Sequence, residues 1–503
     1  MKLSKILKYC DFEKIIGPKN IEVSGICYHS KKTKPNFMFC AIKGQNTDGH
    51  FFIDEAISEG AKTIICEKPF SQIENVAQII VKDSKIALSQ ASQAFYNFPN
   101  KSLKIIGVTG TNGKTSTTFL IKAILDTAGL ASGLIGTIYY QAEKEILKQA
   151  ERTTPMSLDL IQIFDEFLKR NLKYSVMEVS SHSLDLKRVY GLGFKIAVFL
   201  GISREHLDYH KNLKSYLKTK LKIVNENKSD FVLVNIDNPF GKNFLSKVPK
   251  NTKKLTFGKN PKADILAKDI KTSFEGTSFK ICYKNKIIPI NLKLIGDFQV
   301  YNGLAAFGVG VLLRIPLKII KTGFEKIKVI PGRFEVVKAK DFKIIIDYAH
   351  TPEALKKLLL NCKKLPHQKL ILVFGCGGTR DKTKRIPMGE IAGNLADFTI
   401  ITSDNPRFEK PESIINQIEK GIKKTKGNYL KIVDRKKAIE KAIKFAKKDD
   451  LVVIAGKGHE TSQTFKDRTI PFSDKKVAKN LLARIYRGRT SADSLKWGRS
   501  AEV

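Results

Sequence analysis

Short apolar runs of the kind that form buried strands recur along the chain and alternate with stretches of helical periodicity. The clearest runs cover residues 104–108, 174–179, 194–200, 342–346, 370–374, 398–402 and 451–455. Alternation of strands with helices is typical of α/β proteins, because a parallel strand reaches the next one through a helical crossover. The pattern therefore predicts an α/β protein built on parallel sheets.

The chain has 503 residues, which at roughly 100–200 residues per domain corresponds to about three domains. It contains no internal repeat and no long low-complexity linker. From the positions of the motifs described below, we expect domains at residues 1–100, 101–327 and 328–487. Residues 488–503 are a tail with no assigned role.

The first residues contain no apolar segment of the kind found in a signal peptide, because Lys8, Asp11, Glu13 and Lys14 interrupt them. No run reaches the ~18 apolar residues of a membrane-spanning helix. We therefore expect a cytoplasmic protein that does not insert into a membrane.

The cysteines argue against both a disulfide framework and a zinc site. Their number is odd and none forms a CxxC pair, so reduced structural thiols are the favoured interpretation. The seven are Cys10, Cys27, Cys40, Cys66, Cys282, Cys362 and Cys376.

The formal net charge of +40 is the most unusual feature of the composition. A charge of this size is compatible with nucleic-acid binding. However, the lysines are spread along the whole chain and form no single patch, which favours a general lysine bias. We expect no specific nucleic-acid partner, although a positive surface attracts anionic nucleotides.

A glycine-rich segment follows the run at 104–108 and precedes a helical stretch, which is the arrangement of a phosphate-binding loop. Its glycines allow backbone N–H groups to approach phosphate oxygens, Lys114 reaches the β- and γ-phosphates, and the Thr115 hydroxyl is suited to Mg²⁺. Val108 stands where the strict P-loop pattern has glycine, and an ordinary glycine-rich turn is the alternative. The candidate nucleotide-binding residues are Gly110, Thr111, Asn112, Gly113, Lys114, Thr115 and Ser116.

Glu178 ends the run at 174–179, close to the phosphate loop in an α/β sheet, and is a candidate magnesium ligand. By itself it could equally be a solvated carboxylate. The histidines strengthen the functional interpretation, because seven of the eight lie in or beside the segments discussed here.

Polar, glycine-containing loops follow three of the C-terminal runs, at residues 375–382, 404–407 and 456–460. In open α/β sheets, ligands bind outside the carboxyl ends of the strands. The three loops are therefore expected to form one pocket.

The segment TGTNGKT at 109–115, together with MEVSSH at 177–182, DNPR at 404–407 and GKGHE at 456–460, resembles the Mur ligases. The resemblance covers roughly residues 20–480. It implies an α/β fold of three domains, with a central P-loop-type parallel sheet and a Rossmann-like C-terminal domain. It also implies an enzyme that uses ATP and two Mg²⁺ ions.

The resemblance assigns roles around the phosphates. Thr115, Glu178 and His206 match magnesium ligands, and Lys220 matches a lysine that the family carries as a carbamate. A carbamate converts the cation into an anion that binds metal, and it requires a neutral amine. The alternative is a solvated helix lysine. Asn302 and Arg333 match positions that bind ATP. The positions that match catalytic residues are Lys114, Glu178, His206, Lys220, Arg333 and Asp347.

The resemblance also assigns substrate contacts. Ser30, Thr153, Thr154, Ser180 and Arg188 match positions that bind a UDP-muramyl-peptide. Leu186 stands where many relatives have glutamine, which puts one substrate hydrogen bond in doubt. The residues that match the amino-acid site are Arg380, Asp404, Asn405, Pro406, Arg407, Gly456 and Glu460.

The implied reaction joins meso-diaminopimelate to UDP-N-acetylmuramoyl-L-alanyl-D-glutamate through an acyl phosphate. We expect the protein to be a monomer. Arg407 is suited to the distal carboxylate of diaminopimelate, and Glu460 or Asp404 to its ammonium. Three alternatives stay open: a lysine-adding sister enzyme, a ligase similar to folylpolyglutamate synthase, and a nucleic-acid-binding NTPase.

Overall fold

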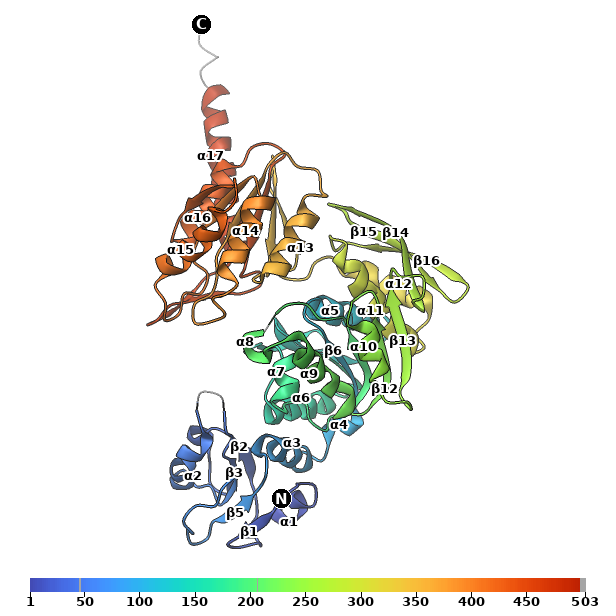
Figure 1. The fold of residues 1–503 in the computed structure, drawn as a ribbon, viewed down its shortest axis with the longest axis vertical. Helices are drawn as coiled ribbons and strands as arrows, with labels where there is room; N and C mark the ends of the chain where they lie inside the picture. The colour runs from blue at the N-terminus through green and yellow to red at the C-terminus, as the bar shows by residue number, and fades with distance from the viewer. Residues whose placement is uncertain (45–46, 206, 498–503) are drawn as a thin grey trace.

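The computed structural model describes residues 1–44, 47–205 and 207–497, and this part of the chain forms three main sheets. The sheets come from successive parts of the chain, and the bodies built on them follow one another from the N-terminal to the C-terminal end (Figure 1). Each domain proposed from the sequence, at 1–100, 101–327 and 328–487, encloses one of these sheets. The expected α/β architecture of three domains is confirmed.

The first sheet has five strands in the order β1-β5-β4-β3-β2, of which β1 is antiparallel to β5. Apolar side chains cover both faces, with α1 and α3 packed on one and α2 on the other. The strands are β1 (Lys14–Ile16), β2 (Gly25–Cys27), β3 (Phe37–Cys40), β4 (Thr63–Cys66) and β5 (Ala77–Ile80). The helices are α1 (Leu3–Leu7), α2 (Ile53–Ser58) and α3 (Ser84–Phe95), with short 3₁₀ turns η1 (Ser30–Lys32) and η2 (Gly49–Phe52).

The central sheet has eleven strands, and β6 lies in its middle between β11 and β10. Parallel pairing extends from β7 to β14, whereas β8–β9 and β14–β16 add antiparallel pairs at the two edges. The strands along the parallel part are β6 (Lys104–Thr109), β7 (Ser132–Ile135), β10 (Tyr174–Glu178), β11 (Phe194–Phe199), β12 (Ser229–Asn235) and β13 (Lys253–Gly258). The edge strands are β8 (Tyr139–Ala142), β9 (Glu145–Gln149), β14 (Ile265–Ser273), β15 (Gly276–Tyr283) and β16 (Lys286–Leu292).

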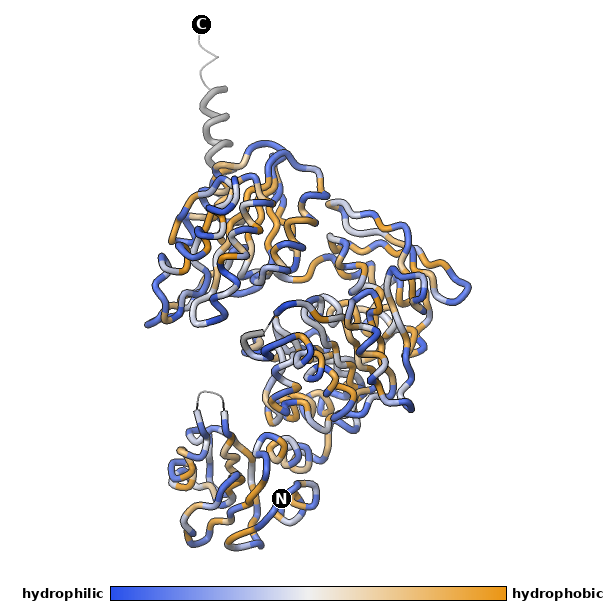
Figure 2. Tube along the Cα trace, viewed as in Figure 1, coloured by the Kyte–Doolittle hydropathy of each residue, from blue (hydrophilic) through white to orange (hydrophobic). Residues whose placement is uncertain are grey.

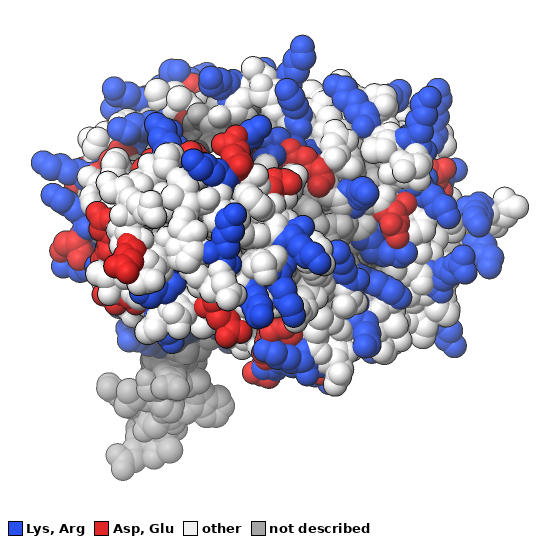
Figure 3. Space-filling model, turned by 90° about the horizontal axis from the view of Figure 1, so that it is seen from below, with Lys and Arg blue, Asp and Glu red and all other residues white. Residues whose placement is uncertain are grey.

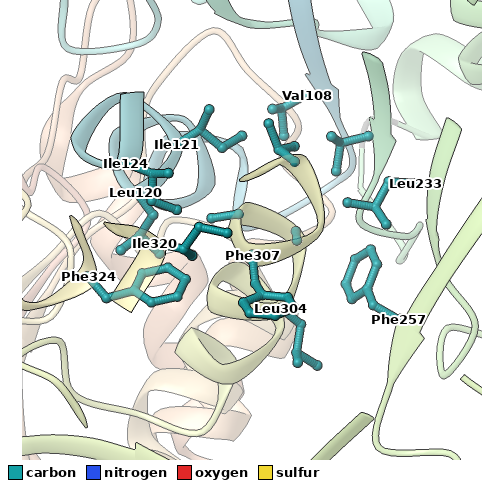
Figure 4. Close-up of a cluster of buried hydrophobic side chains, with 14 of the residues drawn as sticks. Val108, Leu120, Ile121, Ile124, Leu233, Phe257, Leu304, Phe307, Ile320 and Phe324 are labelled. Atoms are coloured by element: carbon teal, nitrogen blue, oxygen red, sulfur yellow. The ribbon is translucent and has the colours of Figure 1, made fainter. Parts of the chain in front are cut away.

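Helices cover both faces of the central sheet. One face packs against α5, α11 and α12, whose apolar side chains meet those of β6, β12 and β13 (Figure 4). The opposite face packs against α6, α9 and α10. The helices of this part are α4 (Pro99–Ser102), α5 (Lys114–Thr127), α6 (Ser157–Lys169), α7 (Ser181–Asp185), α8 (Leu207–His210), α9 (Leu213–Asn225), α10 (Gly241–Ser246), α11 (Phe298–Leu312) and α12 (Leu317–Lys326).

The third sheet has the order β17-β18-β22-β19-β20-β21 and is parallel apart from β17. Helices α13–α15 lie on one face and α16 and α17 on the other, which is a doubly wound arrangement. The strands are β17 (Glu335–Lys338), β18 (Lys343–Asp347), β19 (Leu370–Phe374), β20 (Phe398–Ile401), β21 (Asn428–Lys431) and β22 (Leu451–Ala455). The helices are α13 (Pro352–Cys362), α14 (Arg385–Leu395), α15 (Pro411–Ile422), α16 (Arg435–Phe445) and α17 (Asp474–Trp497).

The remaining strands, β23 (Ser462–Thr464) and β24 (Thr469–Pro471), form a small hairpin before α17. Helix α17 continues to Trp497 and leaves the third body at its outer side (Figure 1). Apolar segments concentrate in the interior strands, whereas the loops are mostly polar (Figure 2). Within residues 1–44, 47–205 and 207–497, no helix has the length and apolar character needed to cross a bilayer.

Candidate active site

The phosphate loop occupies the turn between β6 and α5, at the carboxyl end of the strand in the middle of the central sheet. Gly113 precedes the helix with φ +87°, a left-handed conformation that disfavours other residues. A Cβ atom there would lie 2.5 Å from Asn302 Oδ1. The loop thus places backbone N–H groups and a helix N-terminus where an anion binds.

Lys114 is folded over this loop. Its Nζ donates to the carbonyl oxygens of Gly110 and Thr111 at 2.9 and 2.8 Å. Burial lowers the pKa of Lys114, while the carboxylates of Glu178 and Glu205 oppose that change. The predicted phosphate-binding lysine is therefore at the loop and close to two carboxylates.

Glu178 ends β10 and is 1% exposed. The Thr115 hydroxyl lies 3.0 and 3.1 Å from its two oxygens, and Thr137 contacts it through both N–H and hydroxyl, at 2.8 and 3.1 Å. Hard oxygen atoms of this kind suit Mg²⁺, so the predicted ligands Thr115 and Glu178 fit the ion. The third predicted ligand, His206, lies outside the described residues.

Lys220 projects from α9 and is 1% exposed. Its Nζ lies 3.1 Å from Thr109 Oγ1 and 3.2 Å from the Gly110 oxygen. Burial lowers the pKa of Lys220 well below its usual value, and the Lys114 ammonium lowers it further. The solvated alternative is excluded, and a neutral amine is the form that can become a carbamate.

The third domain contributes Arg333 to the same place. Its Nη2 donates to Thr115 Oγ1 at 3.1 Å, and the guanidinium lies over the Tyr348 ring at 4.6 Å. Asp347 accepts the backbone N–H groups of Phe334 and Ala349 at 2.7 and 2.8 Å. Asp347 thus shapes the turn that carries Arg333, whereas Arg333 itself reaches the phosphate loop.

A cavity of about 560 Å³ lies between the phosphate loop and the third domain. Asn302 is fixed at its wall, because its amide donates to Gln299 at 2.8 Å and accepts from Thr117 at 3.3 Å. A cavity of this size accommodates a nucleotide. Its lining includes Thr111, Asn112, Gly113, Ser116, Asp237, Tyr301, Asn302, Arg333, Asp347, Tyr348 and His350.

The residues expected to bind the muramyl-peptide fall into two places. Thr154 Oγ1 bonds the Glu178 carbonyl at 2.8 Å and accepts the Ser180 N–H at 3.1 Å, and Thr153 and Thr137 hydroxyls lie 3.1 Å apart. Arg188 donates to the Thr154 carbonyl at 3.2 Å. These four predicted residues surround the end of β10, and Leu186 follows α7 nearby.

Ser30 belongs to the other place, in η1 of the first domain, and is buried. The first domain contacts the central one through side chains on both. The Tyr28 hydroxyl donates to Asp159 at 2.7 Å, and the Ser89 hydroxyl donates to the Tyr190 carbonyl at 2.8 Å.

The predicted amino-acid residues come together at the ends of β19, β20 and β22. Arg407, with φ +51°, donates to the Gly378 carbonyl at 3.0 Å. Asn405 Nδ2 donates to Glu460 at 2.9 Å. Gly456, at φ +113°, lies against Asp404, since a Cβ there would be 2.8 Å from the carboxylate. Pro406 is buried beside them, whereas Arg380 is exposed.

Sequence reasoning missed three contacts of this site. Thr137 holds Glu178, but it follows β7, whose sequence carries no recognisable motif. Lys457 pairs with Glu460 at 2.6 Å, and its position inside the loop at 456–460 was a usable signal. Glu205, next to the predicted ligand His206, influences both Lys114 and Lys220.

The chain matches three family models: the Mur ligase family catalytic domain at residues 22–101, the Mur ligase middle domain at 108–310 and the Mur ligase glutamate ligase domain at 332–458. A relative in Caldanaerobacter subterraneus is 44% identical over 96% of this chain and 99% of its own. One in Clostridium acetobutylicum is 40% identical over 97% and 100%. Both are named UDP-N-acetylmuramoyl-L-alanyl-D-glutamate--2,6-diaminopimelate ligase, the second with the number 1.

Solved structures of related ligases are also similar to this chain. A structure of a ligase of that name, 27% identical, superposes with a TM-score of 0.69 over 97% of this chain and 99% of the other. Folylpolyglutamate synthase from Thermotoga maritima, 18% identical, has a TM-score of 0.57 over 73% of this chain and 91% of its own. The latter likeness shows a shared fold alone.

Proposed function

The chain belongs to the Mur ligase family, and on this basis we propose that it joins meso-diaminopimelate to UDP-N-acetylmuramoyl-L-alanyl-D-glutamate at the expense of ATP. The observation that carries the proposal is the group of charged side chains at the ends of β19, β20 and β22. Asn405 donates to Glu460, which joins the loops after β20 and β22, and Arg407 donates to the Gly378 carbonyl in the loop after β19. The names of the full-length relatives support the same substrates.

The chemistry of the pocket suits an amino acid with a charged far end. Diaminopimelate carries a carboxylate and an ammonium at the end that does not react. The Arg407 guanidinium is suited to the carboxylate, and Glu460 or Asp404 to the ammonium. Lysine lacks the distal carboxylate and would leave Arg407 without its partner.

The nucleotide is proposed to bind in the cavity between the central and third domains, with its phosphates on the loop at 110–116. Lys114 and Arg333 bring two positive charges to this loop from two different domains. Charge that develops on a transferring phosphate is stabilised by cations held in place before the reaction. Asn302 is proposed to contact the adenine side.

The reaction then follows from two displacements. The D-glutamyl carboxylate attacks the γ-phosphorus, the bond to ADP breaks, and an acyl phosphate forms. The amine of diaminopimelate attacks the acyl carbon, and phosphate leaves as the amide bond is completed. Lys114 and Arg333 stabilise the phosphate charge in the first step, while Thr154, Ser180 and Arg188 hold the muramyl-peptide.

Two Mg²⁺ ions, held by Thr115, Glu178, His206 and a carbamate on Lys220, would neutralise phosphate charge when bound. The described residues contain no cluster of three or more His, Cys, Asp or Glu side chains placed for a metal. An added anionic group on Lys220 would therefore supply a ligand that the unmodified side chains lack. Its buried amine at the phosphate loop supports this proposal.

The enzyme is proposed to work as a cytoplasmic monomer without nucleic acid. On the face shown in Figure 3, Lys and Arg side chains are scattered among Asp and Glu and do not form one continuous patch. A scattered charge favours weak, salt-sensitive attraction of anions over a dedicated nucleic-acid site. DNA-stimulated ATPase activity that survives physiological salt would favour the NTPase alternative.

The decisive experiment measures ADP release with the UDP-muramyl-dipeptide and one candidate amino acid at a time. We expect rapid release with meso-diaminopimelate and little with lysine, with mass spectrometry identifying the tripeptide product. Preference for lysine would identify the sister activity. No release with either amino acid would refute the proposal.

A further inference from the structure

Lys457 is a buried charge beneath the amino-acid pocket, and the reaction described above does not use it. It lies one residue beyond Gly456, which follows β22, and is 0% exposed. Its Nζ lies 3.0 Å from Asn405 Oδ1 and 2.6 Å from Glu460 Oε2. One ammonium thus connects the loop after β20 with the loop after β22.

The hydrogen bonds around Asn405 fix which way its amide faces. Oδ1 receives the Lys457 ammonium and also the Thr464 N–H at 3.0 Å, and both of these are donors. A flipped amide would place its own N–H₂ against two donors, which is strongly unfavourable. Nδ2 therefore faces Glu460. Within the described part of the chain no other hydrogen bond uses Nδ2, so its second hydrogen can donate to a ligand.

Glu460 is oriented by the same ammonium. Its Oε2 accepts both from Lys457 and from Asn405, at 2.6 and 2.9 Å. Among the described residues no hydrogen bond uses Oε1 of this carboxylate. Oε1 is thus the oxygen available to accept from an ammonium.

We propose that Lys457 is a positioning residue that determines the choice of amino acid. It presents Asn405 as a donor to the ligand's carboxylate and Glu460 as an acceptor for the ligand's ammonium. It also compensates the charge of Glu460, so that the pocket matches a zwitterionic end rather than a simple cation. The inference rests on the proposed function and deepens it.

The test replaces Lys457 by methionine, which keeps the length and removes the charge, with Lys448→Met as a control at an exposed position of the same domain. We expect the KM for diaminopimelate to rise roughly ten- to a hundredfold, as for the loss of a charged hydrogen bond. The KM for ATP and for the UDP-muramyl-dipeptide should change less than about twofold. The preference for diaminopimelate over lysine should also fall, because the pocket becomes more negative.

A KM for diaminopimelate that stays within about twofold of the wild type would overturn the inference. So would equal losses for diaminopimelate and lysine, which indicate a merely structural role. If Lys457→Met does not fold, Lys457→Gln retains a donor toward Asn405 and takes its place in the same assay. For Lys457→Gln we expect a smaller rise in the KM for diaminopimelate, and an unchanged KM would overturn the inference.

The wild-type protein separates this inference from the proposed function. A wild type that does not use diaminopimelate refutes the proposed function itself. A wild type that uses it, combined with an unchanged variant, refutes only the role of Lys457.

Discussion

The Arg435 guanidinium forms a bidentate ion pair with the Asp474 carboxylate, with both N···O distances at 2.8 Å, and neither side chain is exposed. The same guanidinium donates to the carbonyls of Ala455 and Ser403, at 3.0 and 3.4 Å. Those residues immediately precede the two loops that carry Gly456 and Asp404. The pair therefore joins the starts of α16 and α17 to the base of the two loops that carry the proposed amino-acid site.

Breaking this pair should destabilise the fold strongly. Asp474→Asn leaves the buried guanidinium without its counter-charge, at an expected cost of about 3–5 kcal/mol in the free energy of unfolding. The matched control is Glu390→Gln, because the Lys424–Glu390 ion pair has a similar N···O distance of 2.7 Å but is exposed. This substitution should lower the free energy of unfolding by at most about 1 kcal/mol. Urea denaturation measures both, and equal effects would contradict the role of burial.

Lys220→Ala should reduce turnover by at least about a hundredfold, because the variant cannot form the anionic group. Added bicarbonate should not restore activity, whereas a short carboxylic acid such as formate should restore part of it. The control is Lys218→Ala on the exposed side of α9. Near-normal turnover of Lys220→Ala would eliminate the carbamate from the mechanism.

Arg407→Ala should raise the KM for diaminopimelate and affect lysine far less. When lysine binds in place of diaminopimelate, the half-buried guanidinium of Arg407 stays unpaired, which costs about 2–5 kcal/mol of binding free energy. This cost corresponds to a roughly thirtyfold to several-thousandfold preference of the wild type for diaminopimelate over lysine. Specificity (kcat/KM) is compared for both amino acids, with Arg468→Ala as a control since that side chain is 68% exposed. Equal losses for both substrates would exclude Arg407 as the selecting residue.

His459 should make the fold sensitive to acid. Burial lowers its pKa to about 3 in the folded chain, with Arg333 contributing, from an ordinary value of about 6.5. Above pH ~6.5 the imidazole is neutral in both states; as the pH falls, the unfolded chain takes up the proton first and the folded state loses stability.

Melting temperatures between pH 7.5 and 5 test this expectation. The wild type should lose more stability over that interval than His459→Asn, which has no imidazole to protonate. Parallel curves for the two proteins would show that His459 is not responsible for the sensitivity.

The sequence could predict the parts of the site that depend on local order. The runs at 104–108, 174–179 and 451–455 are buried strands, and a loop after a parallel strand falls at one edge of the sheet whatever its partners are. Glu178 and Lys114 were found in this way, whereas Asn405, in the loop after the run at 398–402, was identified through the family resemblance.

Contacts between segments far apart in the sequence could not be predicted. Thr137 reaches Glu178 from the loop after β7, the strand next to β10, and Arg435 reaches Asp474 on another helix. Neither segment has a distinctive sequence pattern. The antiparallel strands β14–β16 were also not anticipated, since their alternation is irregular and Lys268 and Lys271 flank a register shift. Lys457 lies within the loop at 456–460, but its proposed role depends on a contact with Asn405, 52 positions away.

The bond from Arg333 to Thr115 has a practical meaning for building hybrid enzymes. The turn with Arg333 begins the part of the chain that also carries the amino-acid pocket, so one exchange moves both. If the proposed pocket selects the amino acid, a hybrid joined near residue 328 would take the donor's selectivity together with the arginine that contacts the recipient's phosphate loop. A junction placed after β17 would leave Arg333 with the recipient enzyme, so the amino-acid pocket and the arginine would come from two different proteins.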